Sequence, residues 1–234
     1  MAAVGDLHCR EDQHGRFRQF VKQINVEADL LLLCGDLTDR GMVEEGKVLA
    51  EELSALRVPV AAVLGNHDYE HNQAKEICGE LSRAGVHILD GDHFIFEKTL
   101  GVAGVKGFGG GFGNATLQAF GEGQTKSFVQ EAVHESLKLE AALSHLDTPK
   151  KVVIMHYAPV AETLEGENIE IRPFLGTSRL AMPVDHYGAE AVFHGHAHHG
   201  APQGKTKSGI PVYNVAMPLM TKMHPEQRFL LLEV

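Results

Sequence analysis

The sequence predicts an α/β protein built around a largely parallel β-sheet. Three times in succession, a short apolar run ends at a polar loop and is followed by a segment with helical spacing. The apolar runs, such as residues 29–34, are continuous, which is typical of strands that are buried on both faces. Alternating strands and helices imply crossover connections, which gather the loops at the carboxyl ends of parallel strands.

The first half of the chain supplies these three units. Residues 16–26 are assigned to a helix because Phe17, Val21 and Ile24 recur at helical spacing. Gly85 is expected to end the third helix, since glycine readily adopts the left-handed conformation of a helix cap. Strands are predicted at 2–4, 29–34, 58–64 and 86–89, and helices at 16–26, 43–56 and 71–84.

The second half is predicted to hold further strands and one long helix. Residues 126–146 are the longest helical segment, and their apolar side chains form a broad face. No long helix separates the later strands, so this half is expected to form a more antiparallel sheet. The strands are predicted at 93–97, 100–105, 152–155, 191–193, 209–215 and 229–234.

Length and composition favour a single domain over residues 1–234. Hydrophobic residues make up 44% of the chain, enough for a substantial core, and no repeat or linker divides it. The 3 cysteines have no CxxC spacing, which argues against a disulfide framework and a structural zinc site. No secretory signal or membrane span is apparent, so the protein is expected to be cytoplasmic, with no membrane partner.

The formal net charge of −10 makes a nucleic-acid polymer an unfavourable partner, because polyanion binding needs clustered lysine and arginine. Bound cations would reverse the sign of the charge locally. A small anionic substrate is therefore compatible with this composition. The oligomeric state is left open by the sequence.

Polar clusters follow five of the predicted strands. Carboxylate, amide and imidazole groups together suit manganese, iron or zinc better than calcium. Seven such groups are too many for one ion but fit two ions roughly 3.5–4 Å apart that share a carboxylate. The clusters are Asp6-Leu7-His8, Gly35-Asp36-Leu37-Thr38-Asp39, Gly65-Asn66-His67-Asp68, His156 and Gly195-His196-Ala197-His198.

In this order, the clusters match DxH, GDxxD, GNH(D/E), a lone histidine and GHxH. From Asp6 to His198 the chain thus resembles the calcineurin-like metallophosphoesterase superfamily. The resemblance implies a four-layer αββα sandwich, in which two mixed β-sheets are flanked by helices. It also implies a hydrolase of phosphate esters that depends on two divalent or trivalent metal ions.

The resemblance assigns a role to each motif residue. The nucleophile would be a metal-bound hydroxide, and His67 would be the general acid, oriented by Asp39. An imidazole beside two cations resists protonation unless a carboxylate stabilises its charge, so this pairing is physically reasonable. The first metal would be bound by Asp6, His8 and His198, the second by Asn66, His156 and His196, and Asp36 would bridge both.

The substrate is less well defined by the sequence. Analogy with compact family members favours a phosphodiesterase acting on a small substrate. A phosphomonoesterase using the same site, and a non-catalytic partner-binding scaffold on the same fold, remain as alternatives. Protein phosphatase activity is not favoured, because Leu64 stands where those phosphatases carry an arginine before the GNH motif.

Four further features have alternative interpretations. Arg40 could contact phosphate or lie solvated in a loop, and Arg179 could contact phosphate or form a surface salt bridge. Cys9 could line the site or serve as a small packing residue. The glycine-rich residues 107–113 lack a phosphate-loop motif, but Phe108 or Phe112 there could contact a substrate from a flexible rim.

Overall fold

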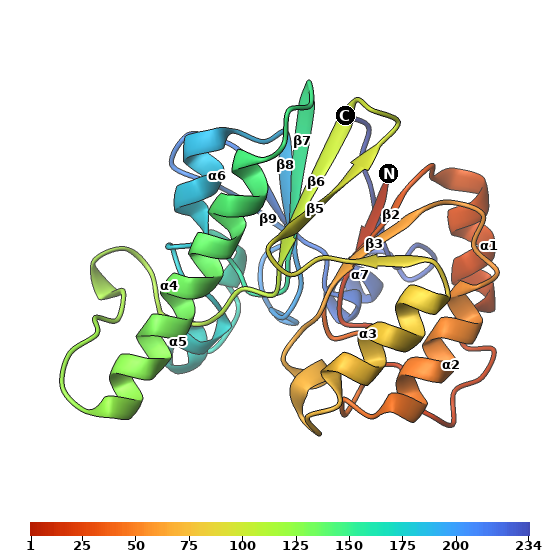
Figure 1. The fold of residues 1–234 in the computed structure, drawn as a ribbon, viewed down its shortest axis with the longest axis horizontal. Coiled ribbons are helices and arrows are strands. Elements are labelled where there is room, and N and C mark those ends of the chain that lie inside the picture. Colours follow the sequence, from red (N-terminus) through yellow and green to blue (C-terminus); the bar gives the residue numbers. More distant parts are fainter.

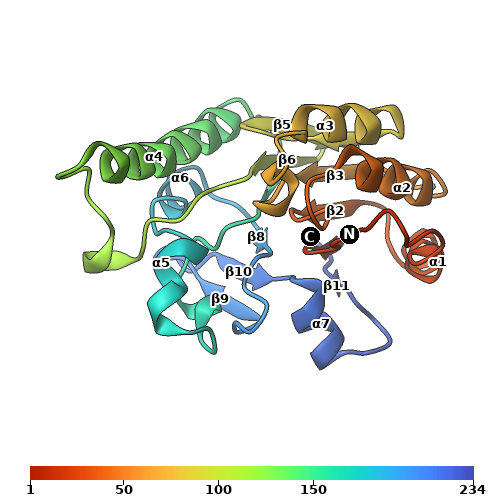
Figure 2. The same ribbon diagram turned by 90° about the horizontal axis from the view of Figure 1, so that it is seen from below.

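The computed structural model describes residues 1–234 and has four layers. Two β-sheets pack face to face, and helices cover the outer face of each (Figure 1 and, from below, Figure 2). The predicted αββα sandwich of two mixed sheets is therefore confirmed.

The first sheet is parallel except at one edge. Its strands run in the order β11-β1-β2-β3-β4, and only β11 is antiparallel to its neighbour. The pairing of β1 with β11 brings the two termini together (Figure 1), and the Met1 ammonium donates to the Leu232 carbonyl at 2.9 Å. The strands are β1 (Ala2–Val4), β2 (Leu31–Cys34), β3 (Val60–Val63), β4 (Val86–Ile88) and β11 (Leu230–Leu231).

Three helices cover the outer face of this sheet, as predicted (Figure 1). Each presents buried apolar side chains to the strands, among them Ile24, Leu49 and Ile77. Gly85 follows the third helix with a φ of +89°, which confirms the predicted left-handed cap. The helices are α1 (Arg18–Glu27), α2 (Val43–Leu53) and α3 (Ala74–Arg83).

The second sheet runs in the order β5-β6-β7-β8-β10-β9. Its four inner strands are parallel, and only the edge strands β5 and β9 are antiparallel to their neighbours. The second sheet has two antiparallel pairings and the first has one, in line with the expected more antiparallel second half, although the inner strands of the second sheet are parallel. The strands are β5 (Asp92–Phe96), β6 (Leu100–Val105), β7 (Lys150–Met155), β8 (Ala191–His194), β9 (Gln203–Lys205) and β10 (Pro211–Asn214).

Connections that contain short helices allow the parallel inner strands. A parallel crossover needs only enough chain to return across the sheet, and here α5 (Arg172–Leu175) and α6 (Ala181–Tyr187) lie within the connection from β7 to β8. The long helix α4 (Gly123–Ser144) joins β6 to β7 and packs beside α6, while α7 (Met217–Met223) follows β10 (Figure 2). The 3-10 helices are η1 (His67–Tyr69), η2 (Gly113–Ala115), η3 (Glu162–Leu164) and η4 (Ile169–Ile171).

The continuous apolar runs are explained by burial on both faces of each strand. In β2, Leu31 and Leu33 face the helices, whereas Leu32 and Cys34 face the second sheet. Complete burial of a leucine side chain contributes roughly 1.5–3 kcal/mol, so both faces add to stability. No helix in the structure combines the length and apolar character needed to cross a bilayer.

Candidate metal centre

The seven predicted ligands lie together where strands of the two sheets end. Asp6, Asp36 and Asn66 follow β1, β2 and β3 of the first sheet. The histidines follow β7 and β8 of the second sheet, at positions 156, 196 and 198, while His8 lies two residues beyond Asp6. Two clusters combine residues from both sheets. The ligand atoms of Asp6, His8 and His198 lie within 4.8 Å of one another, and so do those of Asp36, His156 and His196.

The first cluster comprises Asp6, His8 and His198. The His198 Nε2 lies 2.9 Å from Asp6 Oδ1, and this hydrogen bond raises the pKa of His198. Burial lowers the pKa of His8, which favours the neutral imidazole that can bind a metal. Both ring nitrogens of His8 are buried without a hydrogen-bond partner, and a bound cation would relieve this cost at one of the two.

The second cluster is centred on His156, which is fully buried. Its Nδ1 lies 3.0 Å from the Cys34 carbonyl and can donate to it, which leaves a lone pair on Nε2. That Nε2 faces two acceptor atoms, Asn66 Oδ1 at 2.9 Å and Asp36 Oδ1 at 3.3 Å. Burial lowers the pKa of His156 well below its usual value. A neutral imidazole facing oxygen acceptors fits a cation held between them.

Asp36 contacts both clusters. Its Oδ1 faces His156, and its Oδ2 lies 3.8 Å from His8 Nε2. Burial, followed by the neighbouring carboxylates of Asp6 and Asp68, raises the pKa of Asp36 well above its usual value. Cations on either side of this carboxylate would offset the cost of keeping it ionised.

Four of the seven predicted ligands have left-handed backbone conformations. Their φ angles are +58° at Asp6, +44° at His8, +48° at Asp36 and +68° at His196. Such angles are uncommon for residues other than glycine, and they concentrate where surrounding contacts hold a functional site in a strained geometry. The sequence gives little sign of this strain beyond the glycines that precede Asp6, Asp36 and His196.

Asp68 was assigned no role from the sequence, although it ends the GNHD motif. The structure places its fully buried carboxylate between two of the motif loops. It accepts hydrogen bonds from the backbone amides of Leu37, Thr38 and Gly65 at 3.2, 2.8 and 2.8 Å, and from the Thr38 hydroxyl at 2.6 Å. Asp68 thereby joins the loop that carries Asp36 to the loop that carries Asn66. Its acidic side chain beside His67 is the signal that could have indicated this role.

His67 contacts Asp39 differently from the expected way. Its Nδ1 lies 2.6 Å from the Asp39 backbone carbonyl, whereas the Asp39 carboxylate lies 3.5 Å from His8 Nδ1. The loop that carries Asp39 also passes close to the His67 backbone, since a Cβ at Gly41, where φ is +71°, would lie 2.6 Å from the His67 carbonyl. The carbonyl of Asp39 therefore fixes the ring, and His67 Nε2 points towards Asp36 Oδ2 at 4.0 Å.

Cys9 and Arg40 do not add donors to the two clusters. Cys9 is buried with its thiol near the Arg10 carbonyl, and burial raises the pKa of this thiol to about 12. That environment fits the packing interpretation. The Arg40 side chain is exposed and takes part in no ion pair, in agreement with a solvated loop residue.

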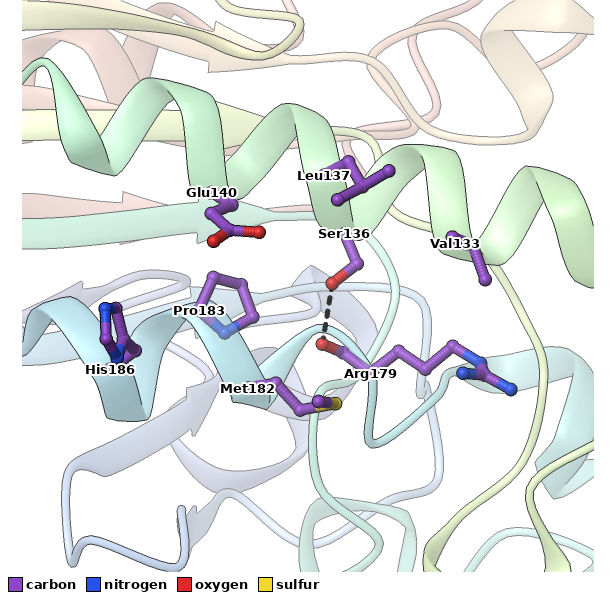
Figure 3. A pocket seen from close by; sticks show the side chains of 8 residues that line it. All are labelled: Val133, Ser136, Leu137, Glu140, Arg179, Met182, Pro183 and His186. Atoms are coloured by element: carbon purple, nitrogen blue, oxygen red, sulfur yellow. Dashed lines mark hydrogen bonds between the residues drawn. The ribbon is translucent and has the colours of Figure 1, made fainter.

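Arg179 lies in a groove between α4 and α6 (Figure 3). Its Nη2 donates to the Leu117 carbonyl at 3.0 Å, and its own carbonyl accepts from the Ser136 hydroxyl. No carboxylate lies within ion-pair distance, so the expected surface salt bridge is absent. The groove contains none of the predicted metal ligands; its lining is Val133, Ser136, Leu137, Glu140, Arg179, Met182, Pro183 and His186.

The glycine-rich loop is held against the segment that contains α5. The amides of Gly110 and Gly111 donate to the carbonyls of Pro173 and Gly176 at 2.6 and 2.9 Å. Phe108 packs between the rings of Phe128 and Tyr157, at centroid distances of 4.8 and 5.8 Å. These contacts fix the loop, and a direct substrate contact by Phe108 or Phe112 stays a prediction.

Similar folds occur among solved structures. A phosphopantetheinyl hydrolase from Mycobacterium tuberculosis matches with a TM-score of 0.69 and 16% identity, covering 97% of this chain and 93% of that one. Protein TT1561 of Thermus thermophilus matches with a TM-score of 0.63 and 18% identity, covering 94% and 89%. At these identities the similarity supports the fold alone.

Sequence relatives match over short segments. A probable cyclic nucleotide phosphodiesterase from Ruthia magnifica subsp. Calyptogena magnifica is 37% identical over 51 residues, and these cover 22% of each chain. A probable glycerophosphodiester phosphodiesterase from Arcobacter nitrofigilis is 36% identical over 56 residues, covering 24% of this chain and 20% of that protein. The matched segments thus span about a fifth of these relatives.

The family described as calcineurin-like phosphoesterase matches residues 1–200, which include all five motifs. Members of this family are metal-dependent, and the two clusters supply candidate metal-binding groups at the strand ends. By this match and by its fold, the chain belongs to the calcineurin-like phosphoesterase family.

Proposed function

We propose that this protein is a metal-dependent phosphoester hydrolase that acts on small phosphodiesters. The observation that carries the proposal is the position of Asp36, whose two carboxylate oxygens face different groups of imidazoles. A carboxylate shared by two donor groups is the arrangement expected of a two-metal centre. Manganese, iron and zinc all suit these donors, so the metals available in the cell would decide which ions bind.

The seven side chains would divide between two ions. When bound, two adjacent cations withdraw charge from a phosphoryl group and activate water for in-line attack. The neutral state favoured for His8, His156 and His196 suits this role, because burial lowers the pKa of each. Asp6, His8 and His198 would hold one ion, Asn66, His156 and His196 the other, and Asp36 both.

His67 would act as the general acid. The Asp39 carbonyl would accept a hydrogen bond from the Nδ1–H group, which leaves Nε2 to hold and release the proton that the leaving oxygen requires. The carboxylates of Asp36 and Glu70 each lie 4.0 Å from a nitrogen of this ring. Asp39 would then position His67 through its backbone carbonyl, while its carboxylate lies 3.5 Å from His8 Nδ1.

The preference for diesters is supported by the two sequence relatives, both of which carry phosphodiesterase names. A phosphomonoesterase acting at the same centre is the second candidate. A non-catalytic scaffold is less well supported, because all seven donors and His67 are retained and brought together. Each of these functions gives a different result in a turnover assay.

The test combines metal analysis with two substrates. The purified full chain, loaded with Mn²⁺, is assayed on p-nitrophenyl phosphate and on bis-p-nitrophenyl phosphate, with and without a chelator. We expect about two bound ions per chain and chelator-sensitive turnover that is faster on the diester. Faster turnover of the monoester would identify a phosphatase, and bound metal without turnover of either compound would identify a scaffold.

A further inference from the structure

A second cavity lies beside the metal centre, at the same ends of the strands. It has a volume of about 410 Å³ and is open to solvent. Leu64 follows β3, Leu89 follows β4 and Lys106 follows β6, so the carboxyl ends of both sheets form its floor. Residues of α3, among them Cys78, line it as well, and so does Tyr69.

Contacts link the lining of this cavity to the candidate second metal cluster: Lys106 Nζ lies 5.6 Å from the centre of the Tyr157 ring, and that ring lies 4.6 Å from the His196 ring. Leu64 and Tyr69 lie on either side of the segment that carries Asn66 and His67. The Lys106 carbonyl accepts hydrogen bonds from the backbone amide of His156 at 2.9 Å and from the next amide at 3.2 Å. A group attached to a phosphoryl centre at the metal cluster could therefore extend into the cavity.

Lys106 is an unusual cation in this position. Only 11% of its side chain is exposed, and the ammonium lies over three aromatic rings, Phe108 at 4.9 Å, Tyr157 at 5.6 Å and Tyr69 at 5.7 Å. One N–H donates to the Gly107 carbonyl at 2.8 Å, and Glu131 lies at 4.0 Å. An ammonium carries three donors, so Lys106 retains the capacity to bind an oxygen acceptor. Burial lowers its pKa, consistent with this enclosure.

We propose that this cavity is the subsite for the organic substituent of the phosphodiester, and that it takes a planar aromatic group bearing a carbonyl or hydroxyl oxygen. The inference rests on the proposed phosphodiesterase function. Leu64, Leu89 and Cys78 supply the apolar contact, Tyr69 supplies an aromatic face, and Lys106 supplies the donor. Asn72, Lys75 and Asp90 also line the cavity, and pockets that bind small molecules combine apolar walls with polar groups in this way, at volumes of about 300–1,000 Å³.

The test compares three p-nitrophenyl phosphodiesters, whose second substituents are methyl, phenyl and thymidine 5′-yl. The proposal predicts that kcat/KM for the phenyl ester exceeds that for the methyl ester by about tenfold or more. Cys78→Phe, which fills the cavity, should bring this ratio towards unity. Ser82→Phe adds the same ring at an exposed position of α3 outside the cavity and should preserve the ratio. Equal rates for methyl and phenyl esters, or a ratio that survives Cys78→Phe, would overturn the proposal.

Lys106→Met tests the donor separately. It should raise KM for the thymidine ester about tenfold while kcat for that ester and the phenyl-to-methyl ratio change little. An equal effect on all three esters would instead indicate a general structural defect and would remove the assigned role of Lys106.

A binding measurement separates this inference from the proposed function. Calorimetric titration of the Mn²⁺-loaded protein with phenyl phosphate and with thymidine 5′-phosphate needs no turnover. If no ester is hydrolysed but Cys78→Phe weakens binding and Ser82→Phe does not, the phosphodiesterase proposal fails and the subsite stands. If both variants bind as the wild type does, the subsite is refuted whether or not the protein is a phosphodiesterase.

Discussion

Asp36 is the side chain on which the candidate centre depends most. It is buried, and it is the residue that contacts both groups of imidazoles. Asp36→Asn removes the charge that both ions would share, so metal content and turnover are expected to fall together. Elemental analysis and the diester assay measure these quantities. Asp29→Asn, at an exposed position, is the matched control, and normal metal content with full activity in Asp36→Asn would rule out the bridging role.

His67→Ala should have a different effect. The Nε2 of His67 is 4.0 Å from Asp36, but its proposed role is proton transfer, so metal content should be retained. Turnover should fall by about 10²–10⁴-fold, chiefly for esters with poor leaving groups, which need a proton most. His71→Ala provides the control, since His71 is an exposed histidine with a similar ring contact to the Arg40 carbonyl. An unchanged rate for alkyl leaving groups would exclude His67 as the acid.

At the scale of elements, the geometry of the centre depends on the ligands and also on contacts between the loops that follow β2 and β3. Asp68 accepts hydrogen bonds from the loops that follow β2 and β3. In Asp68→Asn, an amide NH₂ replaces one acceptor oxygen and faces backbone N–H groups. Each buried donor left without an acceptor costs about 1–3 kcal/mol.

The expected result for Asp68→Asn is a lower free energy of unfolding and weaker metal binding, although Asp68 contacts no metal in the proposed centre. Denaturant unfolding of the metal-free protein measures the first effect, and Mn²⁺ titration measures the second. Asp29→Asn again serves as the reference. Stability equal to that of the reference variant would show that the two loops do not need this carboxylate.

At the scale of the whole molecule, the candidate centre links the two sheets. Asp6 and Asp36 follow strands of one sheet, and His156 and His198 follow strands of the other. Metal ions bound here would stabilise the folded state by mass action, by about 2.7 kcal/mol at a free concentration one hundred times Kd. For a protein of this size, each 1 kcal/mol shifts Tm by roughly 2–4 °C.

Removal of metal by a chelator should therefore lower Tm by several degrees, and addition of Mn²⁺ should restore it. Differential scanning calorimetry at fixed protein concentration measures the shift. The Asp36→Asn variant is expected to show a much smaller change. A wild-type Tm that is insensitive to both chelator and Mn²⁺ would contradict metal binding between the sheets.

Much of this molecule could be predicted from local sequence patterns. Continuous apolar runs predicted β2 and β3, because a strand that is buried on both faces has apolar side chains on both. The motif residues stood at strand ends, and parallel strands bring such ends to one edge. The α/β class, the left-handed cap at Gly85 and the collection of donor types were thus determined by the sequence itself.

Other features were decided only by tertiary packing. The parallel direction of the second sheet, the Asp39 carbonyl that fixes His67, the carboxylate of Asp68 between two loops and the aromatic enclosure of Lys106 all depend on contacts between distant residues. Local periodicity carries no information about which distant group completes a hydrogen bond or which ring lies over a charge. These contacts follow from the packing of two sheets whose strand ends meet at one place. The sequence therefore identified the candidate donor residues, and the tertiary structure determined how they are arranged.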